Sequence, residues 1–261
     1  MTDARYMVPW SQTLGGSRLR SWVRHPAVAA VLLSGPALED AIACRALTAS
    51  IGAEIPPDGL PLFVAVDPHC ATSTLRSPDP RHLALDLAAG GEDFDVTLKV
   101  LSWARPLAEM GIDMVLSPRF DRSQSPLDEP ELAARLVASW TEALVAAGIV
   151  ACAGPFDENC IGGPSPFGAA ISRGLEAVFV DHDASAESIV RLRQWAPDLL
   201  IVASAAQDAL QAQGSVRSSA DLIPFSTEMP EEEIDSILET ATSIDPDRSN
   251  LIDSLRQDWL T

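Results

Sequence analysis

Lysine is nearly absent from this 261-residue sequence: Lys99 is the single example, and basic residues as a whole are scarce. Lysine and arginine together number 18 against 37 aspartates and glutamates, which gives a formal net charge of −19 at pH 7. A surface of this sign repels nucleic-acid phosphates and anionic lipid headgroups. We therefore expect neither a nucleic-acid partner nor a membrane partner. Any chemistry that requires a lysine must use Lys99 or be absent.

Long apolar segments are missing too. The longest runs, such as Val28–Leu33 and Leu60–Val66, are far shorter than the roughly 20 residues that cross a bilayer. The start of the chain, Met1–Gly16, lacks the apolar core of a signal peptide. The four cysteines form no CxxC pair, so free thiols are expected in place of disulfides or a zinc site. These absences predict a soluble, cytoplasmic protein without a metal or another cofactor.

Short runs rich in apolar and β-branched residues alternate along the chain with longer amphipathic segments, which is the pattern of βα units. The runs show little internal alternation, as expected of parallel strands that are buried on both faces. The expected strands are Arg5–Pro9, Val28–Gly35, Leu60–Asp67, Gly111–Pro118, Ile149–Gly154, Leu175–His182, Asp198–Ser204 and Asp221–Ser226. Eight such units predict an α/β protein built as one (β/α)8 barrel over residues 1–261, with an open doubly wound sheet as the alternative. In either fold a ligand site belongs at the C-terminal ends of the strands.

Three segments between the strands have the spacing of amphipathic helices. Pro130–Ala147 carries a continuous apolar stripe that includes Trp140, and Gly148 supplies a stop signal behind it. Ala184–Trp195 is the second expected helix. Glu231–Thr242 is the third, and three acidic residues in its first turn suit the positive end of the helix dipole.

Several stretches carry a family resemblance. Leu60–Arg76 (LPLFVAVDPHCATSTLR) is similar to a strand that ends in Val-Asp-Gln-Glu-Gly-Gly, and Leu107–Asp121 (LAEMGIDMVLSPRFD) to a Leu-x-x-x-Gly-Ile-Asn-x-x-x-x-Pro-x-x-Asp segment. Ala146–Phe156 (AAGIVACAGPF) is similar to a strand that runs into Lys-His-Phe-Pro-Gly-His-Gly. Weaker similarities follow at Gly174–His182 and Asp198–Ala205. In this order, the stretches resemble the N-terminal barrel domain of family 3 glycoside hydrolases, especially the bacterial β-N-acetylglucosaminidase branch.

The resemblance implies a retaining glycosidase site, yet the reacting groups of that site are replaced. Such a site needs a carboxylate nucleophile and an acid/base about 5 Å apart. The family's nucleophile position, at the end of the seventh strand, falls on Ser204–Ala205, with Asp208 shortly after it. The loop that carries the family's histidine–aspartate acid/base pair corresponds to Pro155–Pro164, which has no histidine. We therefore expect that the inherited mechanism is lost.

The residues that grip the sugar in the family are replaced as well. Its Lys-His pair reads Gly154–Pro155 here, and its Gln-Glu-Gly-Gly reads Pro68–Ala71. Its sugar-binding arginine falls on Gln124 or Ser125. Lys99 lies between the third and fourth expected strands, in a segment that is also expected to be helical, and it cannot substitute for the missing lysine.

Polar residues remain at the expected strand ends. Asp67, Asp121 and His182 stand where the resemblance places an aspartate or histidine that contacts a sugar hydroxyl or orients the site. The two aspartates have a structural alternative, which is to cap backbone N–H groups. The expected ligand-binding residues are Asp67, His69, Asp121, Gln124, Asp181, His182 and Ser204.

New acidic residues follow the fifth strand. Asp157 and Glu158 are candidates for a replacement acid/base, with Asp208 as a candidate partner, although acidic residues on a loop of so acidic a chain are commonly just solvated. Asp181 to Asp183 could bind a divalent ion or could open a helix, and no metal site is predicted from them.

Three functions fit this pattern. The first, which we favour, is a degenerate or repurposed barrel that binds a small sugar-like or polyol ligand, with altered chemistry in a biosynthetic pathway as an option. The second is an active but atypical glycoside hydrolase that uses Asp157 or Glu158. The third is a non-catalytic scaffold for protein interaction, which a contiguous patch of exposed tryptophans would favour. The sequence does not decide the oligomeric state.

Overall fold

The computed structural model describes residues 5–10, 16–55, 62–68, 76–118, 125–156, 166–180, 186–203, 220–225 and 229–241. Its strands are β1 (Arg5–Pro9), β2 (Val28–Leu33), β3 (Phe63–Val66), β4 (Met114–Val115), β5 (Val150–Phe156), β6 (Ala177–Val180), β7 (Leu200–Ala203) and β8 (Leu222–Pro224). They pair in parallel in chain order, and β8 returns to pair with β1, so the sheet is a closed barrel. The predicted (β/α)8 fold is confirmed. Each expected run coincides with one strand of the barrel, although β5 extends two residues beyond the expected end at Gly154.

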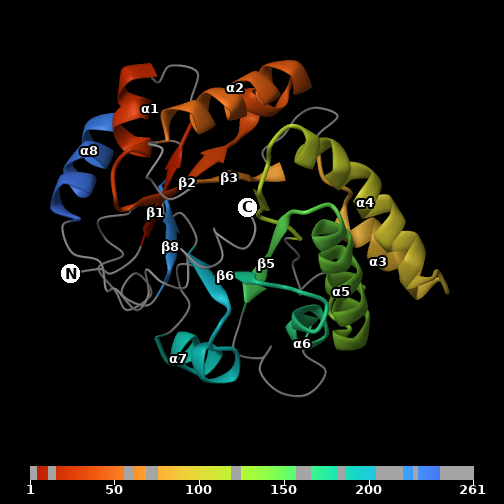
Figure 1. Ribbon diagram of the computed structural model, residues 1–261. Helices are drawn as coiled ribbons and strands as arrows, with labels where there is room; N and C mark the ends of the chain where they lie inside the picture. The colour runs from red at the N-terminus through yellow and green to blue at the C-terminus, as the bar shows by residue number, and fades with distance from the viewer. Residues whose placement is uncertain are drawn as a thin grey trace.

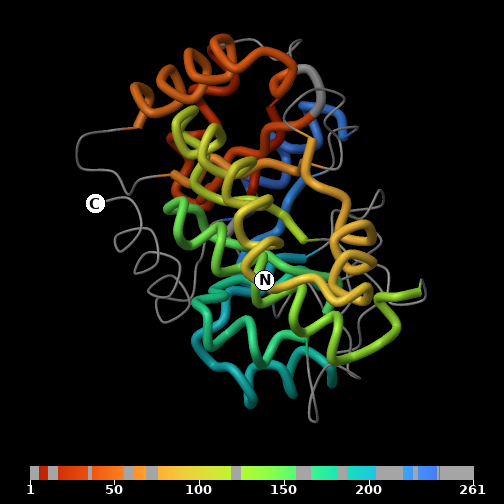
Figure 2. Tube along the Cα trace, turned by 90° about the vertical axis from the view of Figure 1, so that its right-hand side faces the viewer, coloured from red at the N-terminus to blue at the C-terminus, as the bar shows by residue number. Residues whose placement is uncertain are grey.

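Helices surround the strands on the outside, as Figure 1 shows. They are α1 (Gly16–Val23), α2 (Ala41–Glu54), α3 (Pro80–Ala88), α4 (Asp93–Glu109), α5 (Pro130–Ala146), α6 (Pro166–Ile171), α7 (Ala186–Trp195) and α8 (Glu231–Thr240), with a 3-10 turn η1 (Gly35–Leu38) before α2. In both Figure 1 and the rotated view of Figure 2, α2 lies at the top of the molecule and α7 at the bottom. None of the described helices is long and apolar enough to cross a membrane.

The three helices expected from the sequence form close to the expected bounds. Proline at the start of α5 suits the first helical turn, where its missing N–H is not needed. The chain leaves this helix through Gly148, whose φ of 76° is a conformation that glycine adopts without strain. Trp140 is fully buried and meets Trp103 of α4 edge to face, with ring centroids 6.2 Å apart. Lys99 lies on α4, as expected, and its ammonium pairs with Asp86 of α3 at 2.7 Å.

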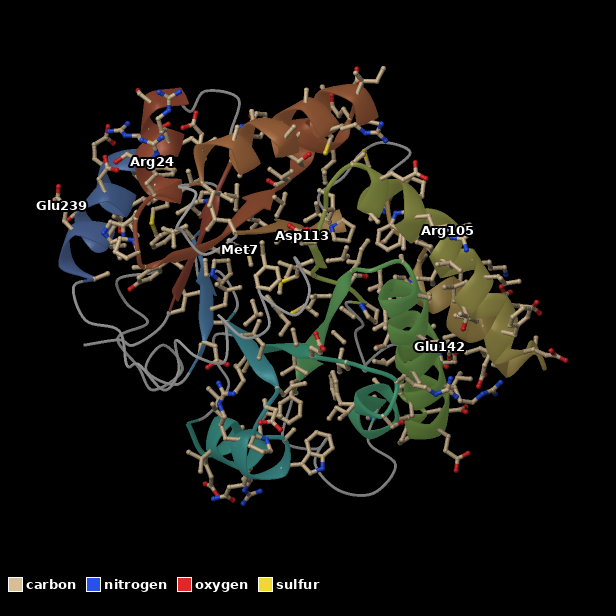
Figure 3. The ribbon with its side chains drawn as sticks, viewed as in Figure 1. Met7, Arg24, Arg105, Asp113, Glu142 and Glu239 are labelled. Atoms are coloured by element: carbon tan, nitrogen blue, oxygen red, sulfur yellow. The ribbon has the colours of Figure 1, made fainter. Side chains whose placement is uncertain are left out.

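Two apolar layers hold the barrel together. The inner layer fills the space inside the strands, where Met7 lies near the centre (Figure 3). It consists of Met7, Ala29, Ala30, Leu32, Phe63, Ala65, Met114, Leu116, Val150, Cys152, Ala177, Phe179, Leu200, Val202 and Leu222. The residues that alternate with these, such as Val64 and Val66, belong to the outer layer between the strands and the helices. Because both faces are apolar, the strands read as continuous hydrophobic runs.

Carboxylates join neighbouring strands at the end of the barrel where the strands begin. Asp113, just before β4, accepts a hydrogen bond from the backbone N–H of Val64 in β3 at 2.8 Å. Asp221, just before β8, accepts one from the N–H of Ile201 in β7 at 2.7 Å and also pairs with Arg193 of α7. Burial raises the pKa of Asp113 to about 6. The two aspartates therefore make the same bond four strands apart, and Arg193 neutralises one of them.

Candidate active site at the barrel mouth

The carboxyl ends of the parallel strands meet at one rim of the barrel, which we call the mouth. The described residues that directly follow a strand at the mouth are Trp10, Ser34, Asp67, Leu116 and Phe225. Asp67 is the only carboxylate in this described group. In barrels of this kind the ligand site is built at the mouth, so Asp67 is the group from which a site can be constructed.

Asp67 is positioned by β3, the strand that it directly follows. Phe63 and Ala65 of β3 belong to the inner layer of the barrel, and side chains of a strand alternate between its faces. The backbone N–H of Asp67 continues the parallel ladder by donating to the carbonyl of Leu33 at 3.3 Å. The next inward position is therefore Asp67, which is 8% exposed. A buried carboxylate at this rim is a hydrogen-bond acceptor well placed for a hydroxyl of a bound ligand.

The neighbouring ends of β4 and β5 are tied together by backbone contacts. Ser117 is fully buried, and its hydroxyl has no hydrogen-bond partner among the described residues. The carbonyl of the next residue, Pro118, accepts a hydrogen bond from the N–H of Gly154 at 3.0 Å. The Gly154 N–H is thereby used within the protein.

Gly154 also has no space for a side chain. A Cβ built on it would lie 2.6 Å from the carbonyl oxygen and 2.7 Å from the Cβ of Phe179 in β6. Here β5 advances by three residues, from Ala153 to Phe156, while β6 advances by two, so β5 carries a bulge. The sequence resemblance assigned the family's sugar-gripping lysine to Gly154. A side chain at this position would require β5 and β6 to separate.

Most of the residues predicted for the site lie outside the described residues. These are Asp157, Glu158, Asp208, His69, Asp121, Gln124, Asp181, His182 and Ser204. Asp67 is the predicted ligand-binding residue that the structure describes, and it is at the mouth as expected. Within the described part of the chain, no group of three or more histidine, cysteine, aspartate or glutamate side chains is placed to hold a metal ion.

Sequence reasoning noticed Gly154–Pro155 as a replacement but missed its structural cause. The bulge and the approach of Phe179 depend on the register between β5 and β6, and a register between strands is not written in either strand alone. A glycine followed by proline near a strand end was the available signal, because both residues disturb a regular ladder.

The fold matches many solved structures, whereas no protein-family profile and no curated protein sequence matches this chain. NagZ from Neisseria gonorrhoeae is similar with a TM-score of 0.80 and 17% identity over 96% of this chain and 89% of that chain. A structure of that protein in complex with N-trifluoroacetyl-D-glucosamine gives a TM-score of 0.79 at 17% identity, over 98% of this chain and 89% of that one.

A glycoside hydrolase family 3 β-N-acetylglucosaminidase from Paenibacillus sp. str. FPU-7 gives a TM-score of 0.77 at 17% identity. The match covers 97% of this chain and 60% of that longer one. At such identities the likeness establishes the fold. The chain therefore has the (β/α)8 barrel fold of the family 3 β-N-acetylglucosaminidases, as its sequence motifs predicted.

Proposed function

We propose that this protein is a degenerate or repurposed family 3 glycoside hydrolase-like barrel that binds a small sugar-like or polyol ligand at the mouth and no longer uses the family's glycosidase mechanism. The contact between Gly154 and Phe179 carries the proposal, because it leaves no room for a side chain where the family places a sugar-gripping lysine. Lys99, the single lysine of the chain, pairs with Asp86 on the outer helices. It does not replace the missing group.

The proposed ligand follows from what remains at the mouth. Asp67 offers a buried carboxylate, and a carboxylate accepts hydrogen bonds from the hydroxyls of a sugar or polyol. Asp181 and Ser204 come directly after β6 and β7 in the chain, which supports further polar contacts at the same rim. The similarity to a NagZ structure that holds a glucosamine derivative supports a sugar-like ligand.

The atypical glycosidase is the alternative that an experiment must separate from this proposal. It would require a second carboxyl group about 5 Å from the first for retention, or about 6.5–9.5 Å for inversion. Asp157 and Glu158 come directly after β5 in the chain and are the candidates for the acid. Interaction-scaffold function receives less support, because none of the described tryptophans is exposed.

Hydrolysis of a panel of nitrophenyl glycosides, including the β-N-acetylglucosaminide, tests the loss of mechanism. We expect no chromophore release above buffer from the wild type, Glu158→Gln or Asp208→Asn. Turnover by the wild type that collapses in either variant would refute the proposal and identify the new acid or nucleophile.

Titration calorimetry with N-acetylglucosamine, glucose and inositol tests the binding half of the proposal. We expect at least one of them to bind the wild type and to bind Asp67→Asn roughly tenfold or more weakly, because hydrogen bonds to a charged acceptor are the stronger kind. Asp95→Asn, which changes an exposed acid on α4, is the matched control and should bind as the wild type does. Binding that is insensitive to Asp67→Asn, or no binding of any of the three, would contradict a ligand site built on this residue.

A further inference from the structure

A groove of about 380 Å³ lies between α1 and α8, on the outside of the barrel. The two helices lie side by side in Figure 1, and Figure 3 labels Arg24, just after α1, and Glu239 of α8 on this side of the molecule. Trp22 and Leu238 lie at the bottom of the groove and are 2% and 3% exposed, whereas Ser17, Ser21 and Glu239 at its edge are exposed. The accessible lining is therefore mainly polar.

Part of the polar lining already has partners within the protein and fixes the shape of the groove. Asp235 of α8 accepts a hydrogen bond from the indole N–H of Trp22 at 2.6 Å and one from Arg18 at 3.1 Å. Arg18 also pairs with Glu231 and Glu232. These bonds join α1 to α8, so the walls of the groove are held in place before any ligand arrives.

Other polar groups of the lining have no partner among the described residues. They are the exposed hydroxyls of Ser17 and Ser21, which lie one helical turn apart on α1, the exposed carboxylate of Glu239, and Nε2 of the half-buried His25, so all four are open to a ligand from solvent. The other ring nitrogen of His25, Nδ1, accepts a hydrogen bond from the N–H of Ala27 at 3.2 Å. A ring that accepts at Nδ1 is neutral and carries its proton on Nε2. Burial lowers the pKa of His25, which agrees with this form.

The charges around the groove favour a cation. Among the lining residues and their ion-pair partners, one arginine, Arg18, stands against the four carboxylates of Glu231, Glu232, Asp235 and Glu239. Arg24, just after α1, is paired with Glu54. The lining includes Trp22 in the last turn of α1 and Glu239 in the last turn of α8, and the C-terminus of a helix attracts positive charge. The net charge of −19 adds to the attraction for cations and repels anionic ligands.

We propose that this groove binds a small primary amine that also carries hydroxyl groups. The ammonium donates to the Glu239 carboxylate, a ligand hydroxyl accepts from Nε2–H of His25, and the serine hydroxyls bond the remaining polar atoms. The carbon skeleton lies against Trp22 and Leu238. Each lining group that has no partner among the described residues then has a complement on one ligand. The site is separate from the mouth and does not depend on the function proposed there.

Serinol, 2-amino-1,3-propanediol, is the probe, and glycerol is its matched control because a hydroxyl replaces the ammonium. Binding is followed by NMR through the indole N–H signal of Trp22, which is assigned by its disappearance in Trp22→Phe. We expect a saturable shift with serinol and at least a roughly tenfold weaker affinity for glycerol, as expected when a charge-assisted hydrogen bond is lost. Glu239→Gln should weaken serinol binding to a similar extent.

One further variant makes the result specific. Glu131→Gln removes an exposed acid at the start of α5 and should leave serinol binding unchanged. Equal affinity for glycerol and serinol, unchanged serinol binding by Glu239→Gln, or the absence of a saturable shift would each overturn the proposal.

Discussion

At the scale of single residues, the lack of a side chain at Gly154 allows the end of β5 to lie close to β6. Gly154 packs its backbone against Phe179 at a distance that no side chain tolerates. The φ of Gly154 is not in the left-handed region, so the requirement for glycine is one of space alone. The proposed loss of the family's sugar clamp rests on the same contact, so Gly154 is the residue to test first.

We expect Gly154→Ala to lower the free energy of unfolding by about 1–3 kcal/mol, the range typical of overpacked sites. Gly52→Ala is the matched control, because Gly52 lies in α2 and a Cβ added there would meet no atom within 4 Å. That change should raise stability by about 0.5–1 kcal/mol, since alanine is the better helix former. Urea unfolding of both variants measures the difference. Wild-type stability in Gly154→Ala would show that β5 and β6 separate easily and that this position tolerates a side chain.

At the scale of secondary-structure elements, the two aspartates that join β3 to β4 and β7 to β8 differ in their charge environment. Asp221 is buried beside Arg193, so its negative charge is compensated. Asp113 has the same bond to the preceding strand, and burial raises its pKa from 3.8 to about 6. The folded protein therefore binds a proton at Asp113 more tightly than the unfolded chain does.

The sign of the pH effect follows from this difference. Between the unfolded pKa of 3.8 and the folded pKa of about 6, the stability contributed by protonated Asp113 is lost as the pH rises. We expect Asp113→Asn to be more stable than the wild type at pH 7, by up to about 3 kcal/mol, because asparagine still accepts the N–H of Val64 without placing a charge at this partly buried position. The advantage should shrink toward pH 4. Thermal unfolding across this pH range measures it.

Asp221→Asn is the contrasting control for that prediction. It makes the same isosteric change to the same type of bond, but it leaves Arg193 without its carboxylate. We expect it to destabilise the protein at pH 7, because the partly buried Arg193 loses the carboxylate that compensates its charge. If both asparagine variants shifted stability in the same direction, the charge environment would not be the cause.

At the scale of the whole molecule, the net charge of −19 causes electrostatic repulsion between the acidic side chains. This repulsion is stronger in the compact folded state than in the expanded unfolded chain, so it lowers the stability of the fold. Raising the ionic strength from about 0.01 to about 0.15 M shortens the Debye length from about 30 to about 8 Å. We expect the melting temperature to rise by a few degrees over this range, equally in sodium and potassium chloride. A constant or falling melting temperature would mean that the ion pairs on the surface outweigh the repulsion.

Much of this architecture was readable from the sequence. The eight apolar runs predicted the eight strands, because strands buried on both faces need continuous hydrophobic residues. Pro130 and Gly148 predicted the start and stop of α5 within one residue, because capping and turn preferences act through neighbours in the chain. The motif around Asp67 predicted both the fold and the position of this residue at a strand end.

Other features were decided only by the tertiary structure. The closure of the barrel pairs Arg5 with Leu222, and the bulge at Gly154 exists because Phe179 occupies the adjacent space. The bond from Val64 to Asp113 and the groove between α1 and α8 also join segments far apart in the chain. Local sequence determines which segments become strands and helices. Register, close approach and burial arise when distant segments pack, so no single segment contains the information that fixes them.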